Sequence, residues 1–214
     1  MESLREPLLQ ARFGGRKVDA RHPDLGESEL AAPPTDGGHE RRTVDLSEAH
    51  RHPPIVGTGP RPGSSTTLLQ WTSEDDTDGL ARQLAGRAAL ARAFIALHGD
   101  LGAGKTTFVR HLLRALGVQG RIKSPTYALA EPHETAAFPA WHFDFYRFDD
   151  PREWEDAGFR DVFDRPGLKL AEWPQKAAGL LPLADLELHI AVQEDGTRSV
   201  RLQANTDIGR ELLA

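Results

Sequence analysis

The chain has 214 residues, of which 39% are hydrophobic, and a net charge of −6 at pH 7. It contains no cysteine, which excludes disulfides, thiolate nucleophiles and zinc–thiolate sites. Its 32 acidic residues outnumber its 26 Lys and Arg residues, so we do not expect a DNA partner held by phosphate neutralisation. No apolar stretch approaches the roughly 20 residues of a membrane span, and no signal-peptide core is present. We therefore expect a cytoplasmic protein without a membrane partner.

The first 66 residues differ in composition from the rest of the chain. They are rich in proline and glycine, contain one aromatic residue, Phe13, and show no sustained period of 2 or 3.6. Such a segment cannot bury enough apolar surface to offset the entropy lost on ordering. We expect residues 1–66 to be a disordered N-terminal extension and residues 67–214 to form one domain. The four histidines of the extension are spaced too irregularly to indicate a metal site (His22, His39, His50, His52).

The first part of the domain is predicted to form a strand, a helix and a second strand. The first strand covers residues 67–72. Thr72 or Ser73 then resembles an N-cap ahead of acidic first-turn residues. Residues 93–99 form a short apolar run that ends in glycine, which is typical of a buried strand. The apolar face of the helix between these strands consists of Leu80, Leu84, Ala88 and Ala91.

The rest of the domain continues the alternation of helices and strands. Residues 105–117 are strongly helical and end at Gly117, a residue typical of a helix C-terminus. The further elements expected are strands over 127–131 and 140–146, a helix over 151–158, a strand over 167–173, and a hairpin of 185–192 with 198–204. This order predicts an α/β fold with a mixed β-sheet flanked by helices.

The strongest chemical motif is GDLGAGKT, residues 99–106, which matches G-x-x-x-x-G-K-[ST] between a predicted strand and a predicted helix. Its glycines allow backbone N–H groups to turn toward phosphate oxygens, and the helix N-terminus adds partial positive charge. Lys105 is expected to reach the β- and γ-phosphates from an exposed loop, and the Thr106 hydroxyl to coordinate Mg²⁺. The motif therefore predicts a nucleoside triphosphate site in a P-loop NTPase-like fold.

Two carboxylates and a tryptophan are candidates to complete this site. Asp144 ends an apolar stretch, the position of a metal-holding Walker-B-type carboxylate; a salt bridge to Arg147 is the alternative. Glu172 closes a predicted strand, so its carboxylate should emerge at the sheet edge where ligands of open α/β sheets bind. There it can complete the metal shell or orient the attacking water. Trp173 can stack on a base or a partner, or belong to the core.

Two further segments have both a functional and a structural interpretation. Residues 124–127, Ser-Pro-Thr-Tyr, follow the phosphate-loop helix at the distance of a switch-like loop, whose Thr hydroxyl can sense the γ-phosphate. Taken alone, Ser-Pro-Thr is only a turn. A group of basic residues is either a solvated helix face or a contact with tRNA or an acidic partner (Arg110, Arg114, Arg121, Lys123).

Five segments together resemble the TsaE (YjeE-type) family of bacterial threonylcarbamoyladenosine-biosynthesis ATPases. The resemblance covers residues 67–204 and rests on GDLGAGKTTF (99–108), K-SPTYALAEP (123–132), HFDFYRF (142–148), LAEWPQ (170–175) and, more weakly, LPLADLELHI (181–190). It implies a subunit that binds ATP and Mg²⁺ and hydrolyses ATP within a complex of the TsaB–TsaD type. That complex modifies the adenosine beside the anticodon of tRNA. This subunit would contact tRNA only indirectly or weakly, and would not be the transferase itself.

The resemblance also implies roles residue by residue. The ATP contacts it implies are Gly102, Ala103, Gly104, Lys105, Thr106, Thr107 and Trp173, with Glu74, Thr77, Gly196 and Arg198 as more distant matches. The catalytic residues would be Lys105, Asp144 and Glu172, and the metal-associated ones Thr106, Glu172 and Asp144. Ser124, Thr126 and Tyr127 would belong to the mobile loop.

Three other function classes share the phosphate loop. A GTPase-like switch could use Asp164-Arg-Pro-Gly167 as a D-x-x-G motif, but no N-K-x-D motif for guanine is present. A small P-loop kinase normally needs an Arg-bearing lid, and the arginines after the switch-like loop are scattered. A non-catalytic adaptor would use the nucleotide only to order a docking surface.

Overall fold

The computed structural model describes residues 65–214. The predicted disordered extension lies outside this range except for its last two residues, which begin the first strand. The helices and strands, with η for 3-10 helices, are β1 (Ser65–Trp71), α1 (Glu74–Ala85), η2 (Ala88–Arg92), β2 (Phe94–His98), α2 (Lys105–Ala115), β3 (Ala130–Glu134), β4 (Pro139–Asp144), α3 (Pro151–Asp156), α4 (Phe159–Asp164), β5 (Leu168–Glu172), η3 (Pro174–Ala177), β6 (Leu186–Val192), β7 (Arg198–Ala204) and α5 (Asp207–Leu213).

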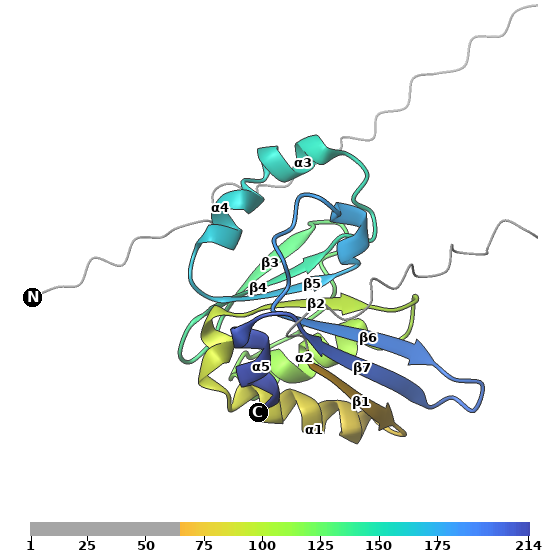
Figure 1. Ribbon diagram of the computed structural model, residues 1–214. Helices are drawn as coiled ribbons and strands as arrows, with labels where there is room; N and C mark the ends of the chain where they lie inside the picture. The colour runs from red at the N-terminus through yellow and green to blue at the C-terminus, as the bar shows by residue number, and fades with distance from the viewer. Residues whose placement is uncertain (1–64) are drawn as a thin grey trace, which may run out of the picture. The chain divides into compact units, whose positions relative to one another are not determined.

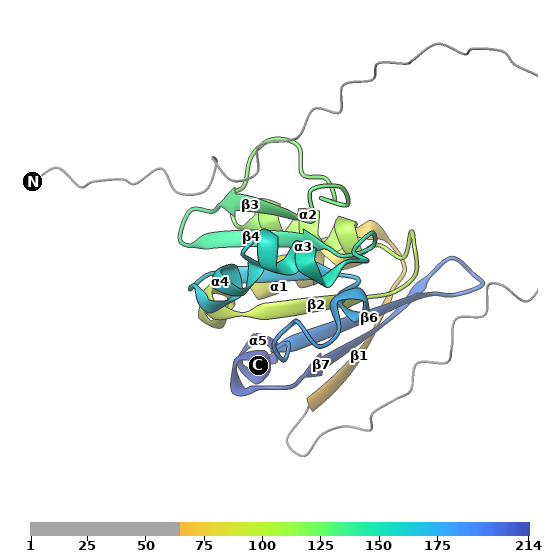
Figure 2. The same cartoon turned by 90° about the horizontal axis from the view of Figure 1, so that it is seen from above.

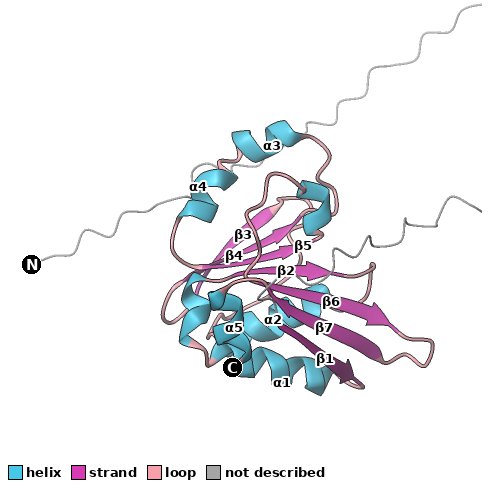
Figure 3. Cartoon of the chain, viewed as in Figure 1, coloured by secondary structure: helices cyan, strands magenta, loops and turns pink. Residues whose placement is uncertain are grey.

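The strands form one seven-stranded mixed sheet in the order β1-β7-β6-β2-β5-β4-β3 (Figure 1). The central strands β6, β2, β5 and β4 are parallel neighbours, whereas β7 pairs antiparallel with β1 and β6, and β3 with β4. Helices lie on both faces of this sheet (Figure 3). The predicted α/β fold is therefore confirmed. The carboxyl ends of β2, β5 and β4 meet at one edge, where a ligand site is expected.

Each face of the sheet has its own hydrophobic core. α1 and α2 bury aliphatic side chains and Phe108 against one face. α3 and α4 cover the opposite face (Figure 2). The core beneath them is aromatic and includes Phe143, Phe145, Trp154 and Phe159. β4 contributes Phe143 to the aromatic core while its alternate residues His142 and Asp144 project toward α2, because successive strand residues point to opposite faces. Phe143, His142 and Asp144 are all buried, so β4 places two polar side chains inside the molecule.

The first helix starts after Ser73, as predicted, but it is shorter than its apolar pattern indicates. α1 ends at Ala85, and Ala88 and Ala91 belong to the separate turn η2. The backbone N–H of Gly86 closes the helix by bonding to carbonyls of its last turn, and the next residue is extended. The apolar face of α1 therefore includes Leu80 and Leu84 but not Ala88 and Ala91.

The strand predicted over residues 127–131 begins three residues too early. β3 starts at Ala130, and the preceding segment is a turn in which the N–H groups of Ala128 and Leu129 donate to the carbonyl of Pro125 at 3.0 and 2.7 Å. Leu129 has φ 62°, a left-handed conformation that is incompatible with a strand. The strand expected over 140–146 likewise ends earlier, at Asp144.

Two short helices, α4 and α5, have no counterpart among the predictions. α5 is fixed by Thr206, whose hydroxyl accepts the N–H of Gly209 at 3.2 Å and donates to Asp185 at 2.6 Å. Six or seven residues hold fewer than two helical turns, so their hydrophobic periodicity gives little signal. None of the helices within residues 65–214 is long and apolar enough to cross a membrane.

Candidate functional site

The glycine-rich loop lies between β2 and α2, as its motif predicted. Gly99, Gly102 and Gly104 have φ values of 142°, 81° and 113°, a region that side chains disfavour. A Cβ atom on Gly99 would lie 2.4 Å from the carbonyl oxygen of Ile190 on β6. Gly104 is the N-cap of α2, so the positive end of that helix dipole lies at the loop.

We expect Gly99→Ala to destabilise the fold by at least about 2 kcal/mol, because it adds backbone strain and a clash with a strand carbonyl. Gly79→Ala is the matched control, since Gly79 lies on the exposed side of α1 with no atom within 4 Å of an added Cβ. That change should stabilise the fold by about 0.5–1 kcal/mol through helix propensity. Urea unfolding of both variants measures the difference. Equal stabilities would contradict the close approach at Gly99.

Lys105 is the first residue of α2, and its side chain is buried rather than exposed as the sequence analysis expected, with 4% of the residue accessible. Its Nζ donates to the carbonyls of Gly99 and Asp100 at 2.7 and 2.8 Å and lies 4.1 Å from the centre of the Trp173 ring. Burial lowers the pKa of this ammonium, and the charge of Glu172 opposes that effect. The loop therefore folds around the lysine and fixes the position of its ammonium.

Glu172, the last residue of β5, connects the sheet to α2. Its Oε1 and Oε2 lie 2.8 and 3.0 Å from the Thr106 hydroxyl, which donates to them. On the other side, Nε2 of the fully buried His142 lies 2.9 Å from Oε1. The carboxylate is thus held from two sides, by a hydroxyl and by an imidazole. His142 was not predicted as a site residue, although its place two residues before Asp144 on the same face of β4 was the available signal.

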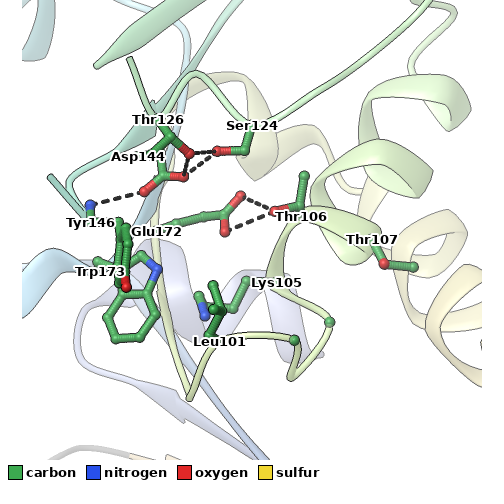
Figure 4. Close-up of a pocket in the computed structure, with 12 residues that line it drawn as sticks. Leu101, Lys105, Thr106, Thr107, Ser124, Thr126, Asp144, Tyr146, Glu172 and Trp173 are labelled. Carbon is green, nitrogen blue, oxygen red and sulfur yellow. Dashed lines mark hydrogen bonds between the residues drawn. The ribbon is translucent and has the colours of Figure 1, made fainter. Parts of the chain in front are cut away.

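Asp144, at the end of β4, holds the segment that follows α2. Its Oδ2 accepts the hydroxyls of Ser124 and Thr126, the latter at 2.7 Å, and its Oδ1 accepts the backbone N–H of Tyr146 at 2.9 Å (Figure 4). The alternative salt bridge to Arg147 is absent among the described contacts of this carboxylate. The switch-like segment is therefore tied to the strand end through Asp144.

These groups line one cavity of about 220 Å³. Figure 4 shows Lys105 and Trp173 on one side and the Ser124–Asp144 group on the other, with Glu172 between them. Trp173 directly follows β5 with φ 57°, a strained conformation for a non-glycine residue that is typical of functional sites. The full lining is Leu101, Gly102, Gly104, Lys105, Thr106, Thr107, Ser124, Thr126, Asp144, Tyr146, Glu172 and Trp173.

Comparison with known proteins identifies the family. The sequence profile described as "Threonylcarbamoyl adenosine biosynthesis protein TsaE" matches residues 71–200, more than half of the chain. The chain belongs to the TsaE family. This agrees with the resemblance seen over residues 67–204.

Individual TsaE proteins are similar over most of their own length. The tRNA threonylcarbamoyladenosine biosynthesis protein TsaE of Haemophilus influenzae is 44% identical over 118 residues, which are 55% of this chain and 74% of that protein. Its counterpart in Bacillus subtilis is 32% identical over 138 residues, 64% of this chain and 85% of that protein. The crystal structure of Bacillus subtilis YdiB aligns with a TM-score of 0.59 at 24% identity, covering 70% of this chain and 93% of that one. This last likeness concerns the fold alone.

Several residues that the TsaE resemblance implied lie outside the cavity lining. Glu74 pairs with Nε2 of His111 at 2.8 Å and so links α1 to α2, and Thr77 is buried in α1. Gly196 lies in the turn between β6 and β7. Arg198 contacts the backbone of the phosphate loop: its Nε donates to the carbonyl of Ala103 at 2.8 Å.

The exposed Tyr127 also lies outside the cavity lining, although its neighbour Thr126 is part of it. The Tyr127 side chain is 85% exposed, and the guanidinium of Arg147 lies 4.6 Å from its ring centre. The arginine proposed as a partner of Asp144 thus contacts an aromatic ring instead.

Two other sequence motifs lie away from the cavity. The guanidinium of Arg110 donates to the carbonyl of Ile122 at 3.5 Å, and that of Arg114 donates to the carbonyl of Gly120 at 3.4 Å. These hydrogen bonds hold the segment after α2 against that helix. Residues 164–167, the D-x-x-G match, precede β5, whereas the cavity residue Glu172 ends that strand. The motif is therefore at the wrong end of the strand for a nucleotide switch.

Proposed function

We propose that this chain binds ATP in the cavity at the N-terminus of α2 and hydrolyses it in support of threonylcarbamoyladenosine formation on tRNA. One observation carries the ATP site: the Lys105 ammonium and the Thr106 hydroxyl begin the same helix and line one cavity, with the Glu172 carboxylate 2.8 Å from that hydroxyl. Membership of the TsaE family and the names of the relatives supply the pathway.

The donor atoms of this cavity suit magnesium. Mg²⁺ prefers oxygen ligands, and hydroxyl and carboxylate oxygens face the cavity. Thr106 and Glu172 would hold the ion, with Asp144 acting through water, and the ion would neutralise charge on the β- and γ-phosphates. Lys105 would contact the same phosphates. One of the two carboxylates would orient the attacking water, while His142 fixes the orientation of Glu172.

The expected partners are proteins of the TsaB–TsaD type, with tRNA contacted indirectly, in the cytoplasm. The net charge of −6 disfavours strong direct binding to tRNA. Leu101 and Tyr146 line the cavity yet are 76% and 39% exposed, so each presents apolar surface to solvent beside the cavity. Exposed apolar and aromatic side chains favour contact with another protein.

The test is a reconstituted reaction with TsaB, TsaD, tRNA and their other substrates, with and without this chain. We expect modified nucleoside to accumulate over many turnovers only when the chain and ATP are present. Equal product without the chain would overturn the assignment to this pathway. Titration with ATP and GTP, and a search for phosphate transfer to an acceptor instead of water, separate the ATPase from a GTPase-like switch and a small kinase.

A further inference from the structure

A second group of metal-ligand side chains lies outside the ATP cavity, where β2 and β6 run side by side. His98 ends β2 and pairs in register with His189 of β6. Glu187 precedes His189 by two residues, so the three side chains project from one face of the sheet. Their ligand atoms all lie within 4.8 Å of one another, and within residues 65–214 they are the one His and carboxylate triad that converges in this way.

The Glu187 carboxylate is close to both imidazoles. Its Oε2 lies 3.0 Å from Nε2 of His189 and 3.9 Å from Nε2 of His98. Its Oε1 accepts the side-chain N–H of Asn205 at 3.2 Å. In metal sites, a hydrogen bond from a neighbouring residue to a ligating carboxylate fixes the orientation of that carboxylate. Asn205 makes such a bond to Glu187. Nδ1 of His189 is buried and forms no hydrogen bond with any described residue, so this ring has an unused nitrogen.

The charge states at neutral pH also suit a cation. Burial, together with the neighbouring His189, lowers the pKa of His98 to about 4, so its imidazole is neutral and offers a lone pair. The hydrogen bond from His189 lowers the pKa of Glu187, which is therefore ionised. Two positive charges, Arg201 and Lys105, disfavour a cation at His98. The guanidinium of Arg201 donates to Gln203 at 2.8 Å.

A second cavity, of about 210 Å³, opens beside this group. His98 and Glu187 line it together with the segment that follows β5, from Pro174 to Ala184. A metal ion held by three protein ligands usually keeps a further position for water or a small ligand. The cavity offers the space for such a ligand.

We propose that His98, Glu187 and His189 bind one divalent transition-metal ion of the Zn²⁺ class, with an open coordination position toward this cavity. Two imidazoles and one carboxylate favour such an ion over Mg²⁺, which prefers oxygen ligands. The site shares no residue with the proposed ATP and magnesium site, so either proposal can fail without the other.

Metal binding requires a small rearrangement of the two rings. The imidazoles of His98 and His189 are stacked, with centroids 4.3 Å apart and planes 6° apart. Metal–nitrogen distances of about 2.1 Å require the ligand atoms to lie within about 4.2 Å of one another. One ring must therefore turn about its Cβ–Cγ bond until both nitrogens point at the ion. His98 lines the adjacent cavity and His189 does not, so we expect the His98 ring to turn.

The experiment is a calorimetric titration of the full chain with Zn²⁺, without nucleotide and with excess Mg²⁺ to occupy oxygen-ligand sites. We expect one ion per chain at this triad. His189→Gln and Glu187→Gln should each weaken binding by at least about tenfold, because each removes a ligand. Arg201→Gln should tighten it, because it removes one of the two opposing charges.

Two controls make the result specific. A variant with all four histidines of the extension replaced by Gln must keep the site (His22, His39, His50, His52). In unmutated protein, the imidazole NMR signals of His98 and His189 should shift on Zn²⁺ addition, which requires no variant to fold. The proposal is overturned if wild type does not bind Zn²⁺, if these signals stay unchanged, or if folded triad variants bind as tightly as wild type. Loss of all binding in the extension variant also overturns it.

Discussion

Lys105→Ala is expected to weaken ATP binding by about 10–100-fold and to slow ATP hydrolysis by about 10²–10³-fold. The lysine is the buried cation of the phosphate loop, and its Nζ is bonded only to the carbonyls of Gly99 and Asp100 among the described residues. Phosphate oxygens can replace those carbonyls, and they gain a charge-assisted hydrogen bond that strengthens as charge develops in the transition state. Calorimetry with ATP and a phosphate-release assay measure the two effects separately.

The burial of Lys105 determines the controls for this variant. Because only 4% of the residue is accessible, a loss of function could arise from a disturbed fold, so circular dichroism and thermal unfolding must accompany the assays. Lys176→Ala is the matched control, since this lysine is 45% exposed and lies near the exposed Asp149 at 3.6 Å. It should leave binding and hydrolysis unchanged. A folded Lys105→Ala protein with normal hydrolysis would remove the loop from the proposed reaction.

Local sequence was enough to place the core of this site. The glycine-rich motif fixes a strand, a turn and a helix within one segment, and the structure has all three in that order. Asp144 and Glu172 could be placed at strand ends because each follows an apolar run. Since β4 and β5 are parallel neighbours with these two residues in register, both carboxylates necessarily reach the same sheet edge.

Two features that were not predicted from the sequence depend on contacts between distant segments. The exposure of Lys105 could not be predicted, because Trp173 covers it from 68 positions further along the chain. The role of His142 depends on the pairing of β4 with β5, which no local pattern specifies. The late start of β3 has a local cause: the N–H groups of Ala128 and Leu129 donate to the carbonyl of Pro125, and this turn overrides the apolar pattern of these residues.

Asp144→Asn is expected to slow ATP hydrolysis by about 100-fold or more while ATP binding changes much less. A carboxylate that acts on a bound metal or its water contributes several kcal/mol to the transition state. The amide oxygen of Asn can still accept the N–H of Tyr146, and its NH2 group can donate to the hydroxyls of Ser124 and Thr126, which then act as acceptors. The variant therefore removes the negative charge and keeps most of the hydrogen bonds. Single-turnover hydrolysis, compared with ATP affinity, measures the charge effect.

Ser124→Ala is the complementary variant, because it removes one hydrogen bond to the carboxylate and keeps the charge. Its effect on hydrolysis should be less than about tenfold, since one such bond contributes roughly 0.5–1.5 kcal/mol. Asp149→Asn, at an 83% exposed side chain, should have no effect. If Ser124→Ala were as damaging as Asp144→Asn, the role of Asp144 would be to hold the 124–127 segment in place. If only Asp144→Asn is damaging, the carboxylate acts on the metal or the attacking water, and Ser124 merely orients it.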